Sequence, residues 1–374
     1  MMARIVIDAT SLLLRSAGVK TYVYHWVQAL RCAAAQDSIR LFPFYGDINA
    51  LNHQGSCAGK LPTALGKLAV HFANTWRNPV LEAVGCAADV FHASQHMRNP
   101  PHRFTRLTAT IFDMTCWLMP EVHTTANVRA TLMYGDRVLR RAAAWIAISE
   151  QSKQDAVDVL GLPAERIEVI YPGVAERFFA AGPPEAQAIA RKYGLERPYI
   201  LSVGTIEPRK NVDRLLDAYQ SVCPRVREEY ELVIGGALGW CSEATAKRLC
   251  AETRGIRYLG YVPESDLPGL TAGAAMFLFP SLYEGFGLPL AQAMACGVPS
   301  ITSRNSSLGE VAGDGAILVE PTSTEEIASA IERLALSPSF AQELGHRGRL
   351  RAASFRWERN AQQSLAFFHR AAKI

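Results

Sequence analysis

The sequence has no apolar stretch that could cross a bilayer, because a charged residue or a proline interrupts every hydrophobic run well before about 18 residues. It has no leader-like start either, since MMARIVIDAT holds one basic residue and a short strand-like run. The formal net charge of +4 is too small to favour a nucleic-acid partner. These absences predict a cytoplasmic globular protein.

Cysteine pairs with redox or metal-binding spacing are also missing. None of the eight cysteines belongs to a C-x-x-C pair or to a histidine-bearing zinc pattern. They are scattered along the chain at Cys32, Cys57, Cys86, Cys116, Cys223, Cys241, Cys250 and Cys296. Several lie in apolar runs, where a free thiol behaves as a small buried hydrophobe. This usage is typical of a reducing compartment.

The modest positive charge is unevenly distributed. Residues 1–180 hold 18 Lys and Arg against 14 Asp and Glu, whereas the remainder is neutral, with 21 of each. A basic first half favours an anionic partner, such as a phosphorylated acceptor or the inner face of a membrane touched peripherally. Ordinary surface variation is the simpler interpretation.

Short runs rich in β-branched residues alternate with longer helical segments throughout the 374 residues. Near-continuous apolar strands separated by helices predict parallel sheets covered on both faces. Six strands are expected in the first half, at Arg4–Ala9, Ile39–Tyr45, Asp89–Ala93, Leu107–Asp113, Trp145–Ser149 and Ile167–Tyr171. Six more are expected in the second half, at Tyr199–Gly204, Glu231–Gly235, Ile256–Gly260, Ala275–Pro280, Ser300–Ser303 and Ala316–Glu320.

Two such sets predict an α/β protein of two Rossmann-like, doubly wound domains. We place the first domain at 1–180 and the second at 195–354, joined by a linker whose AAGPPEAQ run is rich in turn and proline residues and is followed by a short helix. Helices are expected at Val19–Ala34 and Val122–Ala143 in the first domain. A final helix over 355–374 is expected to pack back on that domain.

The most informative loop follows the strand that ends at Pro280. It reads SLYEGFGLPLAQAMACGVPS over Ser281–Ser300, with Pro289 at the start of a predicted helix. Glycines in the turn let the backbone approach a ligand, and the helix N-terminus attracts a phosphate. Glu284 in the loop and Gln292, about one turn into the helix, can both face that ligand. A capped strand-to-helix turn with an exposed glutamate is the plainer interpretation of the glycines alone.

The whole string resembles the E-x7-E region of retaining glycosyltransferases with the GT-B fold, in the GT4-type group. VGTIEPRKN (Val203–Asn211) is similar to that group's phosphate-binding loop, and LGYVPESDL (Leu259–Leu267) to its nucleobase loop. AISEQSKQD, VIYPGV and NSSLGEVAGDGAILVEP match the group in order. The resemblance covers the chain, most strongly over 145–321, and implies two domains facing each other across a cleft.

The resemblance implies a role for individual residues. Glu284 and Asp113 are the implied catalytic residues. The residues implied to bind a nucleoside diphosphate sugar are Gly18, Arg209, Lys210, Tyr261, Val262, Phe286, Gly287, Leu288 and Gln292. Arg209 and Lys210 would pair with the diphosphate, and Tyr261 and Val262 would line the base pocket. Backbone N–H groups of Phe286, Gly287 and Leu288 would hold phosphate oxygens.

Two positions depart from the group's pattern. Gln292 stands where the group has its second glutamate, and Phe112 stands where a histidine often precedes Asp113. Glutamine can still bond a ribose diol, but without charge. His92 and His96 lie at another strand end and are candidates to replace the lost donor. A structural role in the first domain explains one of them equally well.

The implied activity is retaining, metal-independent transfer of a hexosyl or mannosyl residue in polysaccharide biosynthesis. The donor would be a nucleoside diphosphate sugar, and the acceptor a glycan or lipid-linked glycan. The chain has no D-x-D-like pair in a plausible loop, so we expect no metal and no cofactor. It also lacks G-x-G-x-x-G in the first βα turn, which excludes a dinucleotide-dependent dehydrogenase. The alternative is a weakly catalytic or non-catalytic sugar-nucleotide-binding partner of another glycosyltransferase.

Overall fold

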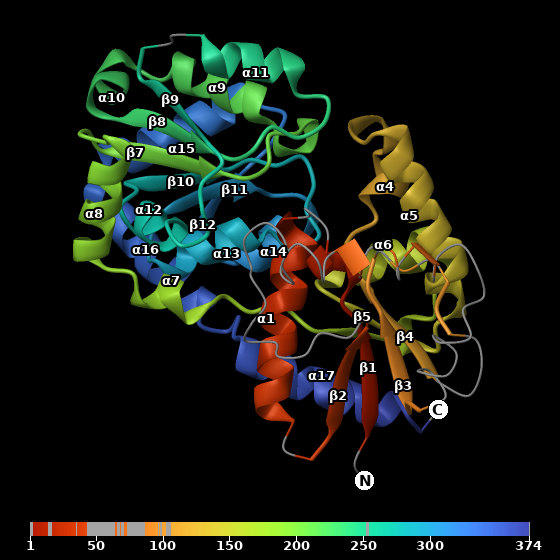
Figure 1. The fold of residues 1–374 in the computed structure, drawn as a ribbon. Helices are drawn as coiled ribbons and strands as arrows, with labels where there is room; N and C mark the ends of the chain where they lie inside the picture. The colour runs from red at the N-terminus through yellow and green to blue at the C-terminus, as the bar shows by residue number, and fades with distance from the viewer. Residues whose placement is uncertain are drawn as a thin grey trace. The chain divides into compact units, whose positions relative to one another are not determined.

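The computed structural model describes residues 3–373 except 14–16, 35, 43–63, 66–67, 69–70, 73–86, 96, 98, 102–105 and 252–253. The chain divides into two compact units, shown in Figure 1. Unit 1 comprises Met1–Pro120, Thr125–Gly173 and Arg356–Ile374, and unit 2 comprises Glu121–Thr124 and Val174–Phe355. Residues 174–180, which the sequence assigns to the first domain, therefore group with unit 2.

Unit 1 is built on a parallel six-stranded sheet of order β2-β1-β3-β4-β5-β6. The strands are β1 (Arg4–Asp8), β2 (Ser38–Phe42), β3 (Val90–Ala93), β4 (Arg106–Ile111), β5 (Ala144–Ala147) and β6 (Ile167–Val169). The helices whose bounds lie in the described residues are α1 (Ala17–Ala33), α4 (Thr115–Leu118), α5 (Thr125–Arg137), α6 (Glu150–Leu160) and α17 (Trp357–Ala371).

Alternation along β3 shows how unit 1 is layered. Phe91 belongs to an apolar cluster with residues of α5 and α6, whereas the neighbouring His92 packs against Trp26 of α1 and Phe368 of α17. Successive strand side chains point to opposite faces, so the sheet is buried on both. The C-terminal helix α17 is part of this unit, where the indole N–H of Trp26 donates to the Ser364 hydroxyl at 3.0 Å.

Unit 2 repeats the plan with a parallel sheet of order β12-β11-β10-β7-β8-β9. The strands are β7 (Tyr199–Val203), β8 (Glu231–Gly235), β9 (Ile256–Gly260), β10 (Met276–Phe279), β11 (Ser300–Ser303) and β12 (Ala316–Val319). The helices are α7 (Glu176–Ala180), α8 (Pro183–Tyr193), α9 (Val212–Ser221), α10 (Pro224–Glu229), α11 (Glu243–Cys250), α12 (Leu267–Ala272), α13 (Leu288–Ala295), α14 (Ser306–Ala312), α15 (Thr324–Leu336) and α16 (Pro338–Ala352). All twelve predicted strands are present, and the ends that lie in the described residues differ by at most two residues from those expected. The expected end of the second strand, Tyr45, lies outside the described residues.

Two predicted segments are wrong. The single helix expected over Val122–Ala143 is instead α5, followed by a 3-10 turn at Leu139–Arg141. The Pro-rich run expected as a linker begins α8, with Pro183 and Pro184 in its first turn. Proline suits that position because the first helical N–H groups have no partner within the helix.

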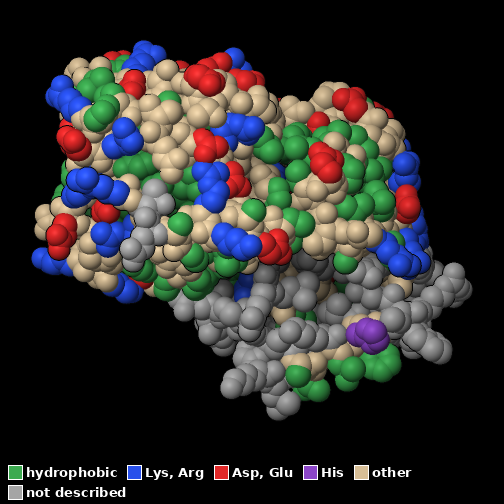
Figure 2. Space-filling model, turned by 90° about the horizontal axis from the view of Figure 1, so that it is seen from above, with side chains coloured by type: hydrophobic (Ala, Val, Ile, Leu, Met, Phe, Trp, Pro, Cys, Tyr) green, Lys and Arg blue, Asp and Glu red, His purple; other side chains and the backbone are tan. Residues whose placement is uncertain are grey.

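The described part of the chain contains no helix with the length and apolar character needed to span a bilayer. On the face drawn in Figure 2, Lys and Arg side chains are interspersed with Asp and Glu side chains over the coloured surface. The coloured part of that face therefore shows no extended patch of one sign.

Candidate functional site

The strand order of unit 2 marks one place on its sheet. From β7 the chain runs outward through β8 and β9 on one side, and then through β10, β11 and β12 on the other. Open parallel α/β sheets bind ligands outside the carboxyl ends of the strands where this reversal occurs. The loops that follow β7 and β10 contain Arg209, Lys210 and Glu284, so the topology brings the three predicted charged residues to the switch point.

The loop after β7 is held rigidly. It ends in a 3-10 turn at Pro208–Lys210, and Asn211 then adopts a left-handed conformation with φ 60°. The Asn211 amide donates to the carbonyls of Pro280 and Pro321, at 2.9 and 2.6 Å. Asparagine tolerates this conformation better than most residues. It thereby ties the loop after β7 to the loops after β10 and β12.

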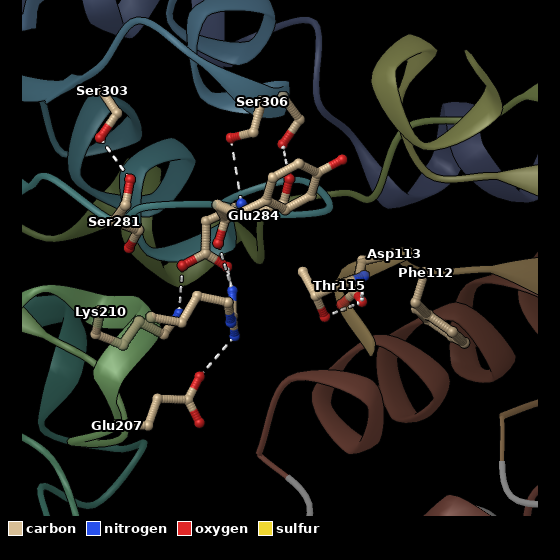
Figure 3. Close-up of polar contacts among 12 residues, drawn as sticks. Phe112, Asp113, Thr115, Glu207, Lys210, Ser281, Glu284, Ser303 and Ser306 are labelled. Atoms are coloured by element: carbon tan, nitrogen blue, oxygen red, sulfur yellow. Dashed lines mark hydrogen bonds and ion pairs between the residues drawn. The ribbon is translucent and has the colours of Figure 1, made fainter. Parts of the chain in front are cut away.

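The loop after β10 is fixed by hydroxyls from the neighbouring β11–α14 segment (Figure 3). Ser303 donates to the carbonyl of Ser281 at 2.6 Å, and Ser307 donates to the carbonyl of Glu284 at 2.8 Å. The Glu284 N–H donates to the Ser306 hydroxyl at 3.2 Å. Ser306 has φ 54°, an uncommon conformation for serine. These bonds fix the backbone that carries the Glu284 side chain.

Glu284 accepts bonds from both predicted cations. The Lys210 ammonium lies 2.5 Å from one carboxylate oxygen, and the Arg209 guanidinium lies 2.6 Å from the other. Arg209 also donates to Glu207 at 2.7 Å, and Lys210 lies 4.9 Å from the centre of the Phe279 ring. All four charged side chains are largely buried, and their formal charges sum to zero. We call this set (Glu207, Arg209, Lys210 and Glu284) the charge cluster.

Burial and ion pairing shift the pKa values of the charge cluster in opposite directions. Burial raises the pKa of Glu284, but the attraction of Arg209 and Lys210 outweighs burial and brings that pKa to about 2. Burial, and to a smaller extent the positive charge of Arg209, lower the pKa of Lys210 although Glu284 and Glu207 raise it. Glu284 is thus held as an anion at neutral pH. The plainer interpretation of this loop, a capped turn with an exposed glutamate, is wrong, because Glu284 is buried.

Helix α13 begins directly beyond this loop. Gly287 is its N-terminal cap, with φ 91°, and Leu288 is its first residue. A Cβ atom on Gly287 would lie 2.4 Å from the Leu308 side chain, so both conformation and packing require glycine. Phe286 is buried edge-on against Phe355, with ring centres 5.2 Å apart. Gln292 lies one turn into α13 and is half-buried.

The two residues predicted to line a base pocket differ in exposure. Tyr261, which directly follows β9, is 63% exposed. Val262 is buried and covers the end of β8, since a Cβ atom added to Gly235 would lie 2.9 Å from it. This pair therefore offers an exposed ring beside an apolar floor, at the carboxyl ends of β8 and β9.

The predicted residues of unit 1 lie at its own strand ends. Gly18 is the second residue of α1 and is exposed, and a Cβ atom there would meet no described residue within 4 Å. Asp113 follows β4 and accepts bonds from the Thr115 N–H at 3.0 Å and its hydroxyl at 2.6 Å. Asp113 therefore stabilises the start of α4 in the structure.

The departure at Phe112 and its candidate replacement His92 both have structural explanations in unit 1. Phe112 is buried edge-on against Tyr22 of α1, with ring centres 5.2 Å apart, so an aromatic core contact replaces a polar group. His92 is fully buried, and its two ring nitrogens bond Thr108 and Thr110 at 2.9 and 2.7 Å. The suggestion that His92 supplies a ligand contact is wrong, because the side chain lies in the core. His96 lies outside the described residues.

Three residues that hold the site were not singled out from the sequence: Glu207, Asn211 and Ser306. Glu207 could have been recognised, because opposite charges two residues apart in EPRKN suggest a pair. Nothing in the sequence signals the left-handed backbone at Ser306. In the described residues, no group of three or more His, Cys, Asp or Glu is arranged to hold a metal ion.

Comparison with solved structures defines the class of fold. The chain superposes on the crystal structure of Anabaena HepE in complex with UDP and glucose with a TM-score of 0.71. The alignment covers 97% of this chain and 98% of that one, at 19% identity. Two parallel Rossmann-like sheets with this match define the GT-B fold, as expected from the sequence.

Comparison with families is more specific. The family described as glycosyl transferases group 1 matches residues 185–351, and glycosyltransferase family 4 matches residues 73–178. The chain is 35% identical to O-antigen chain mannosyltransferase B of Escherichia coli over 268 residues, 71% of this chain and 70% of that protein. It is 30% identical to the serotype-specific mannosyltransferase WbdA of Escherichia coli, covering 65% of this chain but only 31% of that protein. The chain belongs to the GT4-type family of glycosyltransferases.

Proposed function

We propose that the chain is a retaining glycosyltransferase that moves a mannosyl residue from a nucleoside diphosphate to a glycan or lipid-linked glycan. The observation that carries this proposal is the charge cluster at the switch point of the unit 2 sheet. Two buried cations beside the start of α13 suit a diphosphate, and a glutamate beside them suits sugar hydroxyls. The choice of mannose rests on the names of the two Escherichia coli relatives.

In this proposal, the cations act on the leaving group. The bond between the anomeric carbon and the diphosphate oxygen breaks, and its electron pair goes to the diphosphate. Arg209, Lys210 and the N–H groups at the start of α13 stabilise that charge, which is where preorganised donors are most effective. The acceptor oxygen bonds to the same face of the anomeric carbon and passes its proton to the departing diphosphate. We therefore propose that transfer needs no divalent metal.

The ion pairs of Glu284 with Arg209 and Lys210 have a role in donor binding under this proposal. In the described structure Glu284 occupies the same cations that a diphosphate would need. When the donor binds, its phosphates replace the carboxylate, and Glu284 turns to the sugar hydroxyls. We propose that this exchange keeps the two buried cations paired with an anion before and after binding, while the displaced Glu284 carboxylate accepts hydrogen bonds from the sugar hydroxyls.

Nucleotide binding and donor turnover test the proposal together. A thermal-shift panel of UDP, GDP, ADP and dTDP should identify a base, because a ligand at a hundredfold its Kd stabilises by about 2.7 kcal/mol. Release of the diphosphate from the matching mannose donor should then depend on acceptor. A protein that only binds sugar nucleotides would show the thermal shift without any release. Failure of every nucleotide to stabilise the protein would contradict the proposed function.

The location of the protein in the cell stays a prediction. We propose a cytoplasmic protein that meets a lipid-linked acceptor at the inner membrane face, on the strength of the basic first half of the sequence. Co-sedimentation of the purified chain with anionic and neutral vesicles checks this part separately. Equal recovery in the supernatant with both would contradict membrane contact and leave the chemistry untouched.

A further inference from the structure

Glu207 is a buried carboxylate for which the proposed chemistry has no use. Its side chain is 3% exposed and lies 2.7 Å from Nη2 of Arg209. Arg209 uses its other terminal nitrogen, Nη1, for Glu284 at 2.6 Å and for the carbonyl of Tyr283 at 2.7 Å. The two carboxylates therefore hold different nitrogens of one guanidinium.

The backbone around Glu207 is fixed from the neighbouring loop. Ile206 donates to the carbonyl of Ala237 at 2.9 Å and accepts from the N–H of Gly239 at 2.8 Å. A Cβ atom on Gly239 would lie 2.8 Å from Thr205 and 2.9 Å from the Ile206 carbonyl, so the two loops are in close backbone contact. Glu207 itself is extended, and its carbonyl accepts from the Lys210 N–H at 3.0 Å. The carboxylate thus projects from a rigid support.

We propose that Glu207 is a positioning residue, which orients Arg209 for the donor diphosphate both before and after Glu284 is displaced. Glu284 and a phosphate compete for the Nη1 side of the guanidinium. Glu207 holds Nη2, the other terminal nitrogen of the guanidinium, so its bond can persist through donor binding. This inference rests on the proposed function, since it assigns Glu207 a part in the same site.

The sign of the effect distinguishes positioning from simple electrostatics. If Glu207 acted only as a charge, its removal would make the charge cluster positive and would tighten the binding of a diphosphate. If Glu207 orients Arg209, its removal frees a long side chain that must then be ordered on binding, and affinity falls. An arginine has a planar fork of donors, so its orientation decides how well it meets phosphate oxygens.

The test measures the Kd of the nucleoside diphosphate that binds the wild-type protein most tightly among UDP, GDP, ADP and dTDP. We expect Glu207→Ala to weaken binding about tenfold, because the bond that holds Nη2 of Arg209 is lost. Glu207→Gln should weaken binding less, because its amide oxygen still accepts this bond but without charge. In an Arg209→Ala background, Glu207→Ala should change the Kd less than about twofold, since coupled residues are not additive. A structural role alone would not produce this coupling.

Glu231→Gln is the matched control. Glu231 is another buried carboxylate of unit 2 that pairs with an arginine, 3.3 Å from Arg257. It begins β8, at the opposite end of the sheet from the loops of the site. This variant should leave the Kd unchanged, and thermal unfolding of each variant shows whether the fold is intact.

The inference is overturned if Glu207→Ala binds the nucleotide as tightly as wild type or more tightly, or if its loss adds fully to that of Arg209→Ala. In either case the proposed function stands as long as the wild-type protein binds the nucleotide and transfers the sugar. If the wild-type protein binds none of the four nucleotides, the proposed function fails and the inference fails with it.

Discussion

At the residue scale, the most informative side chain is Glu284, because it serves as the internal partner of the cations that a donor would use. Breaking a buried ion pair by removing one partner costs about 3–5 kcal/mol. A change at this position therefore affects stability as well as chemistry.

Glu284→Gln should bind a nucleoside diphosphate at least as tightly as the wild type while losing most transfer. The amide no longer competes with phosphate for Arg209 and Lys210, and it bonds sugar hydroxyls without charge. Calorimetry gives the affinity, and diphosphate release gives the rate. A parallel loss of nucleotide affinity would show that Glu284 helps to hold the diphosphate and would contradict the proposed exchange.

Gln292→Glu should keep the enzyme active and improve affinity for a ribonucleotide donor by about 1 kcal/mol. A carboxylate accepts two bonds from a vicinal diol, whereas an amide accepts one and donates one. For a deoxyribose donor, which has no diol, the change should be neutral or harmful. The comparison uses matched UDP- and dTDP-linked donors, and equal large losses on both would remove the ribose role of Gln292.

At the element scale, the start of α13 combines a left-handed glycine with close packing on Leu308. Gly287→Ala should destabilise the protein by about 1–3 kcal/mol, because alanine is strained at φ 91°. The same variant should weaken nucleotide binding, since the N–H groups of the first turn move with Gly287. Denaturant unfolding and calorimetry measure the two effects.

Gly297→Ala is the matched control for that variant. Gly297 lies just beyond the C-terminal end of α13 with φ 75°, and a Cβ atom there would make only ordinary contacts. It should therefore cost stability through backbone strain and leave the nucleotide Kd unchanged. Equal losses of affinity in both variants would mean that reduced overall stability, and not a change at the start of α13, weakens nucleotide binding.

The elements could be predicted largely from sequence, whereas the contacts of the site could not. Buried parallel strands are short, continuous apolar runs between turn residues, which is why all twelve were found. The prediction of a single helix at Val122–Ala143 was wrong because the residues after α5 also have helical composition, although the backbone turns there. The pairing of Glu284 with Arg209 and Lys210 depends on β10 lying beside β7, a neighbour relation that no local pattern records.

The wrong prediction for His92 also arose because a local pattern does not record which elements are neighbours in the fold. A histidine at a strand end suggests a ligand contact, but the direction of its side chain is set by the pleat of β3. His92 faces the layer of α1 and α17, where two threonine hydroxyls satisfy its ring. Knowing which face of the sheet those helices cover required the position of the C-terminal helix α17, which is 265 or more residues away in the sequence.

At the scale of the whole molecule, the buried His92 should make stability depend on pH. Burial lowers the pKa of His92 from its ordinary value of 6.5 to about 3. Between pH 6.5 and about pH 3, His92 is therefore protonated in the unfolded chain but neutral in the folded protein. The free energy of unfolding therefore decreases as the pH falls from 6.5 towards 3, by about 1.4 kcal/mol for each pH unit.

His92→Gln should flatten this dependence, because its amide can bond both threonines and does not titrate. Unfolding free energies at pH 7, 6 and 5 for the two proteins measure the difference. Identical slopes for the wild type and His92→Gln would contradict the account of the unit 1 core.

The central claim concerns the molecule as a catalyst: two buried cations and the start of α13 hold a diphosphate leaving group during sugar transfer without a metal. The most direct measurement is acceptor-dependent release of the nucleoside diphosphate from a mannose donor in EDTA, with Glu284→Gln in parallel. The account predicts release by the wild type at a rate unaffected by chelation, and a rate at least a hundredfold lower (about 2.7 kcal/mol) in the variant. Loss of wild-type release in EDTA that Mg²⁺ or Mn²⁺ restores, or a wild-type rate in the variant, would contradict it.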